Sequence, residues 1–213
     1  MKLVIIGDGG HGKVIKDIAE AAGWSVSAIL DDRYKEVTFE RDVLKGPVSA
    51  AQYFIGKGNQ LILGIGSNTV RKSIVNQLNL DDEHYATVIH PSAVISKQAE
   101  VRAGTVCMPH TVINQGSVVG QHVILNTGAV IEHDNRIEPF VHLSPKATTT
   151  GNVTIGTGTH IGASAVIIPG VIVGEWSTVG AGAVIIHNTG NYETVVGNPG
   201  RVVKTYTPIQ LNG

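Results

Sequence analysis

Hydrophobic residues recur at every sixth position through the second half of the chain. From Ile89 to Ile185 this step gives (185 − 89)/6 + 1 = 17 positions, and all are Ile, Val or Leu except Cys107 and Thr149. A period this regular indicates an internal repeat, with one short strand per unit. Three units make one triangular coil of roughly 18 residues, so the repeat predicts a parallel β-helix of between five and six coils.

A second inward series follows four residues behind the first. It runs from Ala93 to Thr189 in steps of six, and only Asn135 is not Ala, Ser, Thr or Val. A large residue followed by a small one fills a narrow interior without voids. Glycine is also frequent directly after the large residue, where close backbone turns favour a residue without a Cβ; examples are Gly120, Gly156, Gly162, Gly174 and Gly180.

The segment in front of the repeat has a different pattern. An apolar run at 3–7 opens onto a glycine-rich turn, and a helical pattern at 14–22 follows it. Further apolar runs at 26–30 and 61–66 predict strands, and 69–78 predicts a helix. Strands alternating with helices favour a small parallel sheet with Rossmann-like winding.

We therefore predict an α/β fold class in front of the repeat, with three segments. Residues 1–85 form a Rossmann-like domain, 86–203 the β-helix domain, and 204–213 a C-terminal tail without clear pattern.

Composition narrows the class of protein. With 42% hydrophobic and 15% charged residues the chain should bury a core, and a net charge of −1 gives no basic face for nucleic acid. The N-terminus lacks the features of a signal peptide, no apolar stretch is long enough to span a membrane, and the single Cys107 forms no internal disulfide. We expect a cytoplasmic protein.

The loop at 7–13, GDGGHGK, lies between a predicted strand and helix, where free backbone N–H groups favour an anion. Asp31 and Asp32 end the next strand, at the place from which a carboxylate reaches ribose hydroxyls. A third strand end carries Gly66 to the same edge. These features favour a mononucleotide site, against the alternatives of a tight turn and a solvated acidic pair.

His133 and Asp134 lie at outward phases of the repeat, directly before the exceptional Asn135. Transfer of a group to an amine or hydroxyl needs a base that takes the acceptor's proton, and a neighbouring carboxylate can orient the histidine and stabilise the imidazolium. A local rule broken beside such a pair indicates function. The alternative is an ordinary surface histidine.

His142 lies nine residues, half a coil, beyond His133, so the two should face different sides of one prism. A site that uses both would be formed by two neighbouring subunits, which predicts a cyclic oligomer such as a trimer. His160 lies one coil above His142, and we expect it to be an ordinary surface histidine. The histidine spacing predicts no metal site.

Five motifs together resemble the bacterial sugar acetyltransferases of the PglD/NeuD type over nearly the whole chain, including members from exopolysaccharide operons. They are IIGDGGHGKV at 5–14, ILDD at 29–32, VIHPSAVIS at 88–96, NTGAVIEHD at 126–134 and VVGNPGRVVK at 195–204. The resemblance implies a left-handed β-helix, a homotrimer and an acetyl-CoA-dependent transfer, without a metal, to the 4-amino group of a UDP-linked sugar.

The resemblance also implies roles for particular residues. His133 would be the general base and Asp134 its acidic neighbour, and Asn126 would help to place the acceptor amine. The UDP-sugar would be held by Gly9, Gly10, His11, Asp31, Asp32 and Gly66. The acetyl-CoA path would be lined by His142, Gly151, Ala163 and Ala181, although the run of threonines at 148–150 departs from the repeat just before Gly151.

The implied mechanism is a direct transfer with no acyl-enzyme, because Cys107 occupies an inward phase. Two alternatives remain open at this point. One is O-acetylation of a free sugar such as a sialic acid, since one histidine can serve either acceptor. The other is a non-catalytic β-helix that scaffolds a polysaccharide-synthesis complex.

Overall fold

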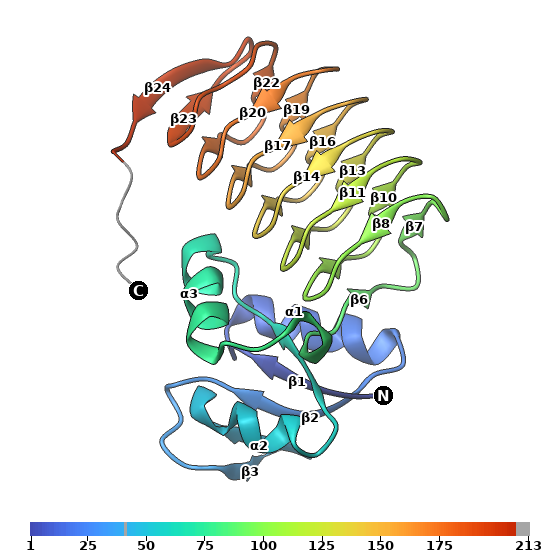
Figure 1. Cartoon of the computed structure of the whole chain (residues 1–213), viewed down its shortest axis with the longest axis vertical. Helices are drawn as coiled ribbons and strands as arrows, with labels where there is room; N and C mark the ends of the chain where they lie inside the picture. Colours follow the sequence, from blue (N-terminus) through green and yellow to red (C-terminus); the bar gives the residue numbers. More distant parts are fainter. Residues whose placement is uncertain (41, 208–213) are drawn as a thin grey trace.

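The six-residue period folds as a three-sided prism of parallel strands, the left-handed β-helix that was expected (Figure 1). The computed structural model describes residues 1–40 and 42–207. Up to Ile185, the strands of the prism pair in parallel with the strand one coil away, as Ile124 pairs with His142. The last two strands, at 193–196 and 201–205, pair with each other antiparallel. The spacing of such paired residues confirms the predicted length of one coil.

The three faces are named here in the order in which the chain visits them. The first face holds β6 (Val88–Ile89), β9 (Val106–Cys107), β12 (Ile124–Leu125), β15 (His142–Leu143), β18 (His160–Ile161), β21 (Thr178–Val179), β23 (Glu193–Val196) and β24 (Arg201–Thr205). The second face holds β7 (Val94–Ile95), β10 (Val112–Ile113), β13 (Val130–Ile131), β16 (Thr148–Thr149), β19 (Val166–Ile167) and β22 (Val184–Ile185). The third face holds β8 (Glu100–Val101), β11 (Val118–Val119), β14 (Arg136–Ile137), β17 (Thr154–Ile155) and β20 (Ile172–Val173).

Both inward series meet in one continuous core along the prism axis. From Cys107 upward the large series is buried, and Ala129, Ala147 and Ala165 of the small series pack against it. At the lower end Ile89 is 37% exposed, because no coil lies below it. Alternating large and small side chains thus fill the prism as the sequence predicts.

The corners of the prism are made by left-handed residues at a fixed phase. Every sixth residue from Gly104 to Gly182 has φ between 53° and 75°, and Asp134 and Trp176 are among them. The glycines that follow the large inward residues serve a different purpose. A Cβ on Gly156, for example, would lie 2.5 Å from the backbone nitrogen of Glu175 in the next coil. Those glycines allow close stacking of coils, while the turn itself lies two residues later.

The N-terminal segment forms a five-stranded sheet in the order β3-β4-β2-β1-β5. Its elements are β1 (Lys2–Ile6), α1 (Gly10–Ala21), β2 (Ser25–Leu30), β3 (Thr38–Glu40), β4 (Val43–Gly46), η1 (Val48–Ala50), α2 (Ala51–Ile55), β5 (Gln60–Leu63), α3 (Asn68–Leu78) and η2 (Asp82–His84). The order reverses at β1, which pairs with β2 on one side and β5 on the other, and such a switch point is where α/β sheets bind ligands. The antiparallel β3–β4 hairpin was not predicted.

The N-terminal sheet and the prism share a core. Ile15 and Ile18 of α1 pack with Val88, Val106 and Ile124 of the lowest coils on the first face. The helix α3 reaches higher coils at the edge of the prism, where its Asn68 donates to the carbonyls of Gly158 and Thr159 (Figure 1). At the other end β24 continues to Thr205, and residues 208–213 of the predicted tail lie outside the described residues. The domain boundaries at 85 and 203 remain predictions.

Candidate active site

A cavity of about 180 Å³ opens at the carboxyl edge of the N-terminal sheet. It is lined by Gly7, Asp31, Asp32, Val48, Ile65 and Ile74 among others. Asp31 accepts hydrogen bonds from the backbone N–H of Asp8 at 2.9 Å and of Arg33 at 3.1 Å. Asp32 accepts one from the N–H of Val48 at 3.0 Å. The two predicted carboxylates therefore line the cavity and also hold the surrounding loops in place through backbone hydrogen bonds.

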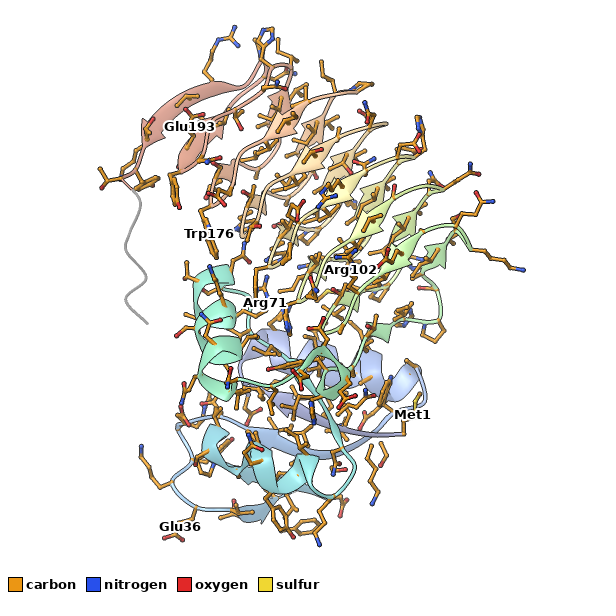
Figure 2. All side chains as sticks on the ribbon, viewed as in Figure 1. Met1, Glu36, Arg71, Arg102, Trp176 and Glu193 are labelled. Carbon is orange, nitrogen blue, oxygen red and sulfur yellow. The ribbon has the colours of Figure 1, made fainter. Side chains whose placement is uncertain are left out.

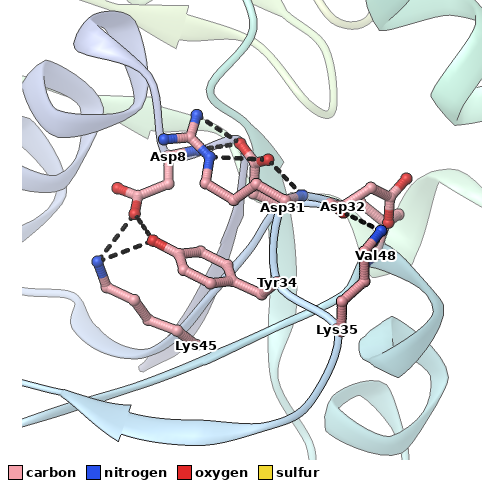
Figure 3. A network of polar contacts seen from close by, with 8 residues as sticks. Asp8, Asp31, Asp32, Tyr34, Lys35, Lys45 and Val48 are labelled. Atoms are coloured by element: carbon pink, nitrogen blue, oxygen red, sulfur yellow. Dashed lines mark hydrogen bonds and ion pairs between the residues drawn. The ribbon is translucent and has the colours of Figure 1, made fainter.

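Asp8 anchors a charged network beside this cavity that sequence reasoning missed (Figure 3). It accepts hydrogen bonds from Lys45 Nζ at 2.8 Å and from the Tyr34 hydroxyl. Burial opposes ionisation of Asp8, but these two partners hold its pKa below the usual value. Likewise, hydrogen bonds from Asp8 and Arg33 outweigh burial and lower the pKa of Asp31. The edge thus keeps two ionised carboxylates in fixed positions.

The glycines of the first loop divide into two groups. Gly7, with φ at 108°, and Gly12 bring α1 close to β5, because a Cβ on Gly64 would lie 2.7 Å from Gly12 Cα. In contrast, a Cβ on Gly9 or Gly10 would meet nothing within 4 Å. Gly9 is the N-cap of α1, and no side chain of the cap accepts a hydrogen bond from the first N–H groups of this helix. This arrangement suits an anion.

His11, His142 and Asn126 come together between the N-terminal sheet and the first face. The rings of His11 and His142 are 6.1 Å apart. Asn126 Nδ2 donates to His142 Nε2 at 3.2 Å, while Asn126 Oδ1 accepts from the N–H of Thr127 at 2.8 Å. His142 therefore uses its Nε2 lone pair to hold the amide, and the amide has a fixed orientation.

His160 belongs to this cluster, contrary to our expectation of a surface histidine. Its ring stacks on His142 at 4.9 Å and 3°, and its Nε2 is 2.7 Å from the hydroxyl of Ser144. Burial, with smaller effects from the charges of His160, Arg71 and His11, lowers the pKa of His142 to about 3. Burial and Arg71 also lower the pKa of His11 to about 4. The cluster is therefore a set of neutral rings at pH 7.

A second cavity, of about 230 Å³, continues from this cluster between α3 and the first face. It is lined by Gly66, Ser67, Asn68 and Thr69 from the N-terminal part and by Gly158, His160, Trp176, Ser177 and Thr178 from the prism. A Cβ on Gly66 would meet nothing within 4 Å, so this strand end is open to an approaching group. The two cavities are neighbours, because Ile65 lines the first and Gly66 lines the second, and Figure 2 labels Trp176 of the second cavity and Arg71 of α3.

His133 and Asp134 lie on a different corner, between β13 of the second face and β14 of the third. His133 Nδ1 is 2.8 Å from Asp134 Oδ2, and the two side chains are 62% and 64% exposed. Because the carboxylate accepts the Nδ1 proton, the Nε2 lone pair stays free. A Cβ on Gly151 would lie 2.5 Å from the ring at Cε1 and Nε2. The imidazole therefore occupies the space that a side chain at position 151 would fill.

Asn135 secures the backbone under this pair. Its Nδ2 donates to the carbonyls of Glu132 at 2.7 Å, His133 at 3.1 Å and Thr150 at 2.8 Å. Its own N–H donates to the Ser117 hydroxyl at 3.0 Å. The exception in the small-residue series is therefore a buried amide that fixes the corner carrying His133.

The remaining predicted cofactor residues divide between the two corners. Ala163 and Ala181 lie one coil apart on the corner between the first and second faces, where Gly182 N–H donates to the Ala163 carbonyl at 2.8 Å. This is the corner of Asn126, whereas Gly151 lies with His133. The threonine run at 148–150 keeps the regular coil, since Thr148 and Thr149 form β16. One chain therefore brings Asn126 to His142, and His133 to Asp134 and Gly151, but not the two groups to each other.

Cys107 lies in the prism core at 0% exposure, and burial raises the pKa of its thiol to about 12. Among residues 1–40 and 42–207, no cluster of three or more His, Cys, Asp or Glu is arranged to hold a metal. No helix in the described part of the chain has both the length and the apolar character to cross a membrane.

Comparison with known proteins agrees with both halves of this geometry. Residues 2–78 match the PglD N-terminal domain, and residues 151–187 match the bacterial transferase hexapeptide repeats. A stretch of 109 residues is 39% identical to UDP-N-acetylbacillosamine N-acetyltransferase from Bacillus subtilis (strain 168), and the match spans half of this chain and half of that protein.

Two solved structures align over nearly their full length. PerB from Caulobacter crescentus, in complex with CoA and GDP-perosamine, is 32% identical, with a TM-score of 0.87 over 96% of this chain and 98% of that one. The acetyltransferase domain of PglB from Neisseria gonorrhoeae is 34% identical, with a TM-score of 0.85 over 95% and 99%. A related structure of that domain contains acetyl coenzyme A, at 32% identity and a TM-score of 0.85 over 95% and 98%.

The fold and the two histidine sites define a hexapeptide-repeat acyltransferase with a nucleotide-type domain in front of its β-helix. The chain belongs to the PglD/NeuD-type family of sugar acetyltransferases. The family expected from the sequence motifs is confirmed.

Proposed function

We propose that this protein transfers an acetyl group from acetyl-CoA to the 4-amino group of a nucleotide-linked amino sugar, with UDP as the expected nucleotide, in bacterial glycan or polysaccharide biosynthesis. The observation that carries the proposal is the exposed His133–Asp134 pair with its free Nε2, in a chain that also has an open edge for a nucleotide. Two relatives support an amine as acceptor: the Bacillus subtilis UDP-N-acetylbacillosamine N-acetyltransferase, and the Caulobacter crescentus perosamine N-acetyltransferase PerB, whose structure contains CoA and GDP-perosamine.

The reaction follows from the hydrogen bonds of the pair. The lone pair of the acceptor nitrogen attacks the thioester carbon, while His133 Nε2 takes a proton from that nitrogen. A C–N bond forms, the C–S bond breaks, and the CoA sulfur leaves and receives the proton from the imidazolium. Asp134 holds the ring in the required tautomer and stabilises its positive charge. No acyl-enzyme is needed, because the one thiol is buried.

We further propose a homotrimer in which one subunit contributes His133, Asp134 and Gly151 and its neighbour contributes Asn126, His142, Ala163 and Ala181. Support comes from the separation of these two groups on different corners of one prism. A cyclic assembly repeats one such contact at every interface. In this arrangement Gly9, Gly10, His11, Asp31, Asp32 and Gly66 hold the nucleotide-sugar. Since acetyl-CoA and nucleotide sugars are cytoplasmic metabolites, we propose that the enzyme acts there.

The direct test is an activity panel. The protein would be incubated with acetyl-CoA and with UDP- or GDP-linked 4-amino sugars or free sialic acid, while released CoA thiol is followed. Turnover with a nucleotide-linked amine, and a melting temperature raised by the matching nucleotide, are expected. Turnover with the free sugar alone would instead assign O-acetylation. CoA that neither binds nor turns over would point to a scaffold.

A further inference from the structure

Arg71 of α3 is a buried cation that the reaction itself does not use. Its side chain is only 1% exposed, and burial lowers the pKa of its guanidinium to about 9, with no acidic group acting in the opposite direction. Isolating a charge in this way is costly unless hydrogen bonds replace its water. The partners that replace the water reveal what this residue does.

Most of those partners are backbone carbonyls from two parts of the fold. Arg71 Nη1 donates to Ile65 O at 3.0 Å and more weakly to Gly66 O at 3.4 Å, at the end of β5. Its Nε donates to His122 O at 2.9 Å, and its Nη2 donates to Phe140 O at 2.7 Å. One planar group therefore joins the edge of the N-terminal sheet to the prism.

Asn68, one helical turn earlier on α3, extends the same attachment. Its Oδ1 accepts from Arg71 Nη2 at 3.0 Å, and its Nδ2 donates to the carbonyls of Gly158 at 2.9 Å and Thr159 at 3.3 Å. His122, Phe140 and Gly158 are left-handed corner residues at the same phase of successive coils, so they form one column along a corner of the prism. The two side chains thus bind three successive coils and fix the height of α3 along the prism.

The attachment lies between the proposed nucleotide site and the buried histidine cluster. Ile65 lines the cavity at the sheet edge, and Gly66 lines the cavity that continues to His160. Val141, whose carbonyl is 3.4 Å from Arg71 Nη2, directly precedes His142. A shift of α3 along the prism would therefore move a bound nucleotide relative to His142.

We propose that Arg71 and Asn68 form an interdomain clamp that positions the nucleotide-bound sugar against the acetyl-transfer site. This role rests on the proposed function. Both are positioning residues: they act through the loop at 65–68 and through the carbonyls of the prism. A loosened clamp should leave each ligand bound to its own half while misplacing the amine relative to the thioester.

The test compares Asn68→Ala and Arg71→Lys with Asn76→Ala, which removes an exposed asparagine from the same helix. Lysine keeps the charge of Arg71 but cannot bridge the two sets of carbonyls. We expect kcat to fall at least tenfold in both clamp variants. The Kd of UDP or GDP, whichever binds wild type more tightly, and the KM of acetyl-CoA should stay within twofold, and Asn76→Ala should match wild type.

Two results would overturn the clamp. In one, Asn68→Ala and Arg71→Lys lower the melting temperature but keep wild-type kcat, which makes the contacts merely structural. In the other, nucleotide affinity falls as far as kcat, which places their effect within the N-terminal half alone.

Hydrogen exchange separates failure of the clamp from failure of the proposed function. Faster exchange at 64–68 and 138–142 in Asn68→Ala, but not in Asn76→Ala, is expected even if the activity panel finds no turnover. Unchanged exchange at both segments would refute the clamp whether or not the wild type is active.

Discussion

The two histidine sites of this chain differ in almost every physical respect. His133 stands with Asp134 on a corner where both side chains are more than 60% exposed. His142 is 9% exposed, its ring stacks on His160, and it accepts a hydrogen bond from Asn126. The Nε2 lone pair of His133 is free, and the side chain is open to solvent. His142 is enclosed by other side chains, and its Nε2 lone pair accepts a hydrogen bond from the Asn126 amide.

This contrast indicates how the work of the site is divided. A proton acceptor must reach the substrate with a free nitrogen, while a positioning group must be held rigidly by its surroundings. His133 meets the first requirement and the Asn126–His142 pair meets the second. Neither corner is a complete site alone, so a neighbouring subunit is expected to unite them.

The largest expected effect comes from removing the free lone pair. His133→Ala should lower kcat by about 10²- to 10⁴-fold, the usual contribution of a general base, while acetyl-CoA still binds. Steady-state kinetics and calorimetry would measure the two quantities. His187→Ala is the matched control, because His187 lies on the same corner three coils higher. Normal turnover in His133→Ala would remove this residue from the mechanism.

Mixing variants tests whether the two corners complete each other across subunits. Asn126→Ala and His133→Ala should each be nearly inactive. In a mixed trimer of either composition, one of the three interfaces pairs an intact His133 with an intact Asn126, so about a third of the activity should return. Co-expression with two affinity tags, followed by assay of the mixed species, measures this. Failure of the mixture to recover would place both residues in one subunit.

Acid should lower the free energy of unfolding through the buried histidines. Burial lowers the pKa of His122 to about 4, so below pH 6.5 the unfolded chain binds a proton that the folded chain excludes. The unfolding free energy should therefore fall as pH falls from 6.5 to 4, by about 1.4 kcal/mol per pH unit for each such group. Urea unfolding at several pH values would measure the slope. His122→Asn, which tolerates the left-handed backbone, should make it shallower, and an unchanged slope would contradict this origin.

The smallest expected effect comes from adding one methyl group under the exposed pair. In Gly151→Ala the new Cβ would meet the His133 ring at 2.5 Å, and the ring would have to turn away from Asp134. We expect kcat to fall about tenfold, the cost of a misplaced base, with little change in melting temperature. Kinetics and thermal melts on the same preparation would decide. Wild-type kcat would show that the ring need not rest on Gly151.

Much of the prism could be predicted from the sequence because its determinants are local. The large and small inward series, the phase of His133 and Asp134, and the exceptional Asn135 all follow from counting in sixes. The β3–β4 hairpin could not be found this way, since three- and four-residue strands carry little periodicity. The contacts of Asp8 were missed for the same reason, since Lys45 lies on β4 of this hairpin and Tyr34 lies in the loop before β3.

The clamp formed by Arg71 and Asn68 could not be predicted from the sequence for a different reason. Arg71 binds carbonyls of residues 51 to 70 positions away, and a backbone carbonyl leaves no mark in the amino-acid sequence. His160 was misjudged because phase alone says that a side chain points outward. Whether solvent or a neighbouring element lies there depends on how α3 docks, and that docking is set by the same carbonyls.

The left-handed corner that returns every sixth residue also restricts how this protein can change in length. An insertion of one residue would move the outward residue that precedes each large one, such as Arg136 before Ile137, into the inward position throughout the remaining coils. Six residues would preserve packing but carry every later residue one corner around the prism. Only a whole coil restores both, so above Ala181, the highest residue of the proposed site, the prism can vary in height by whole coils without moving the residues on which the site depends.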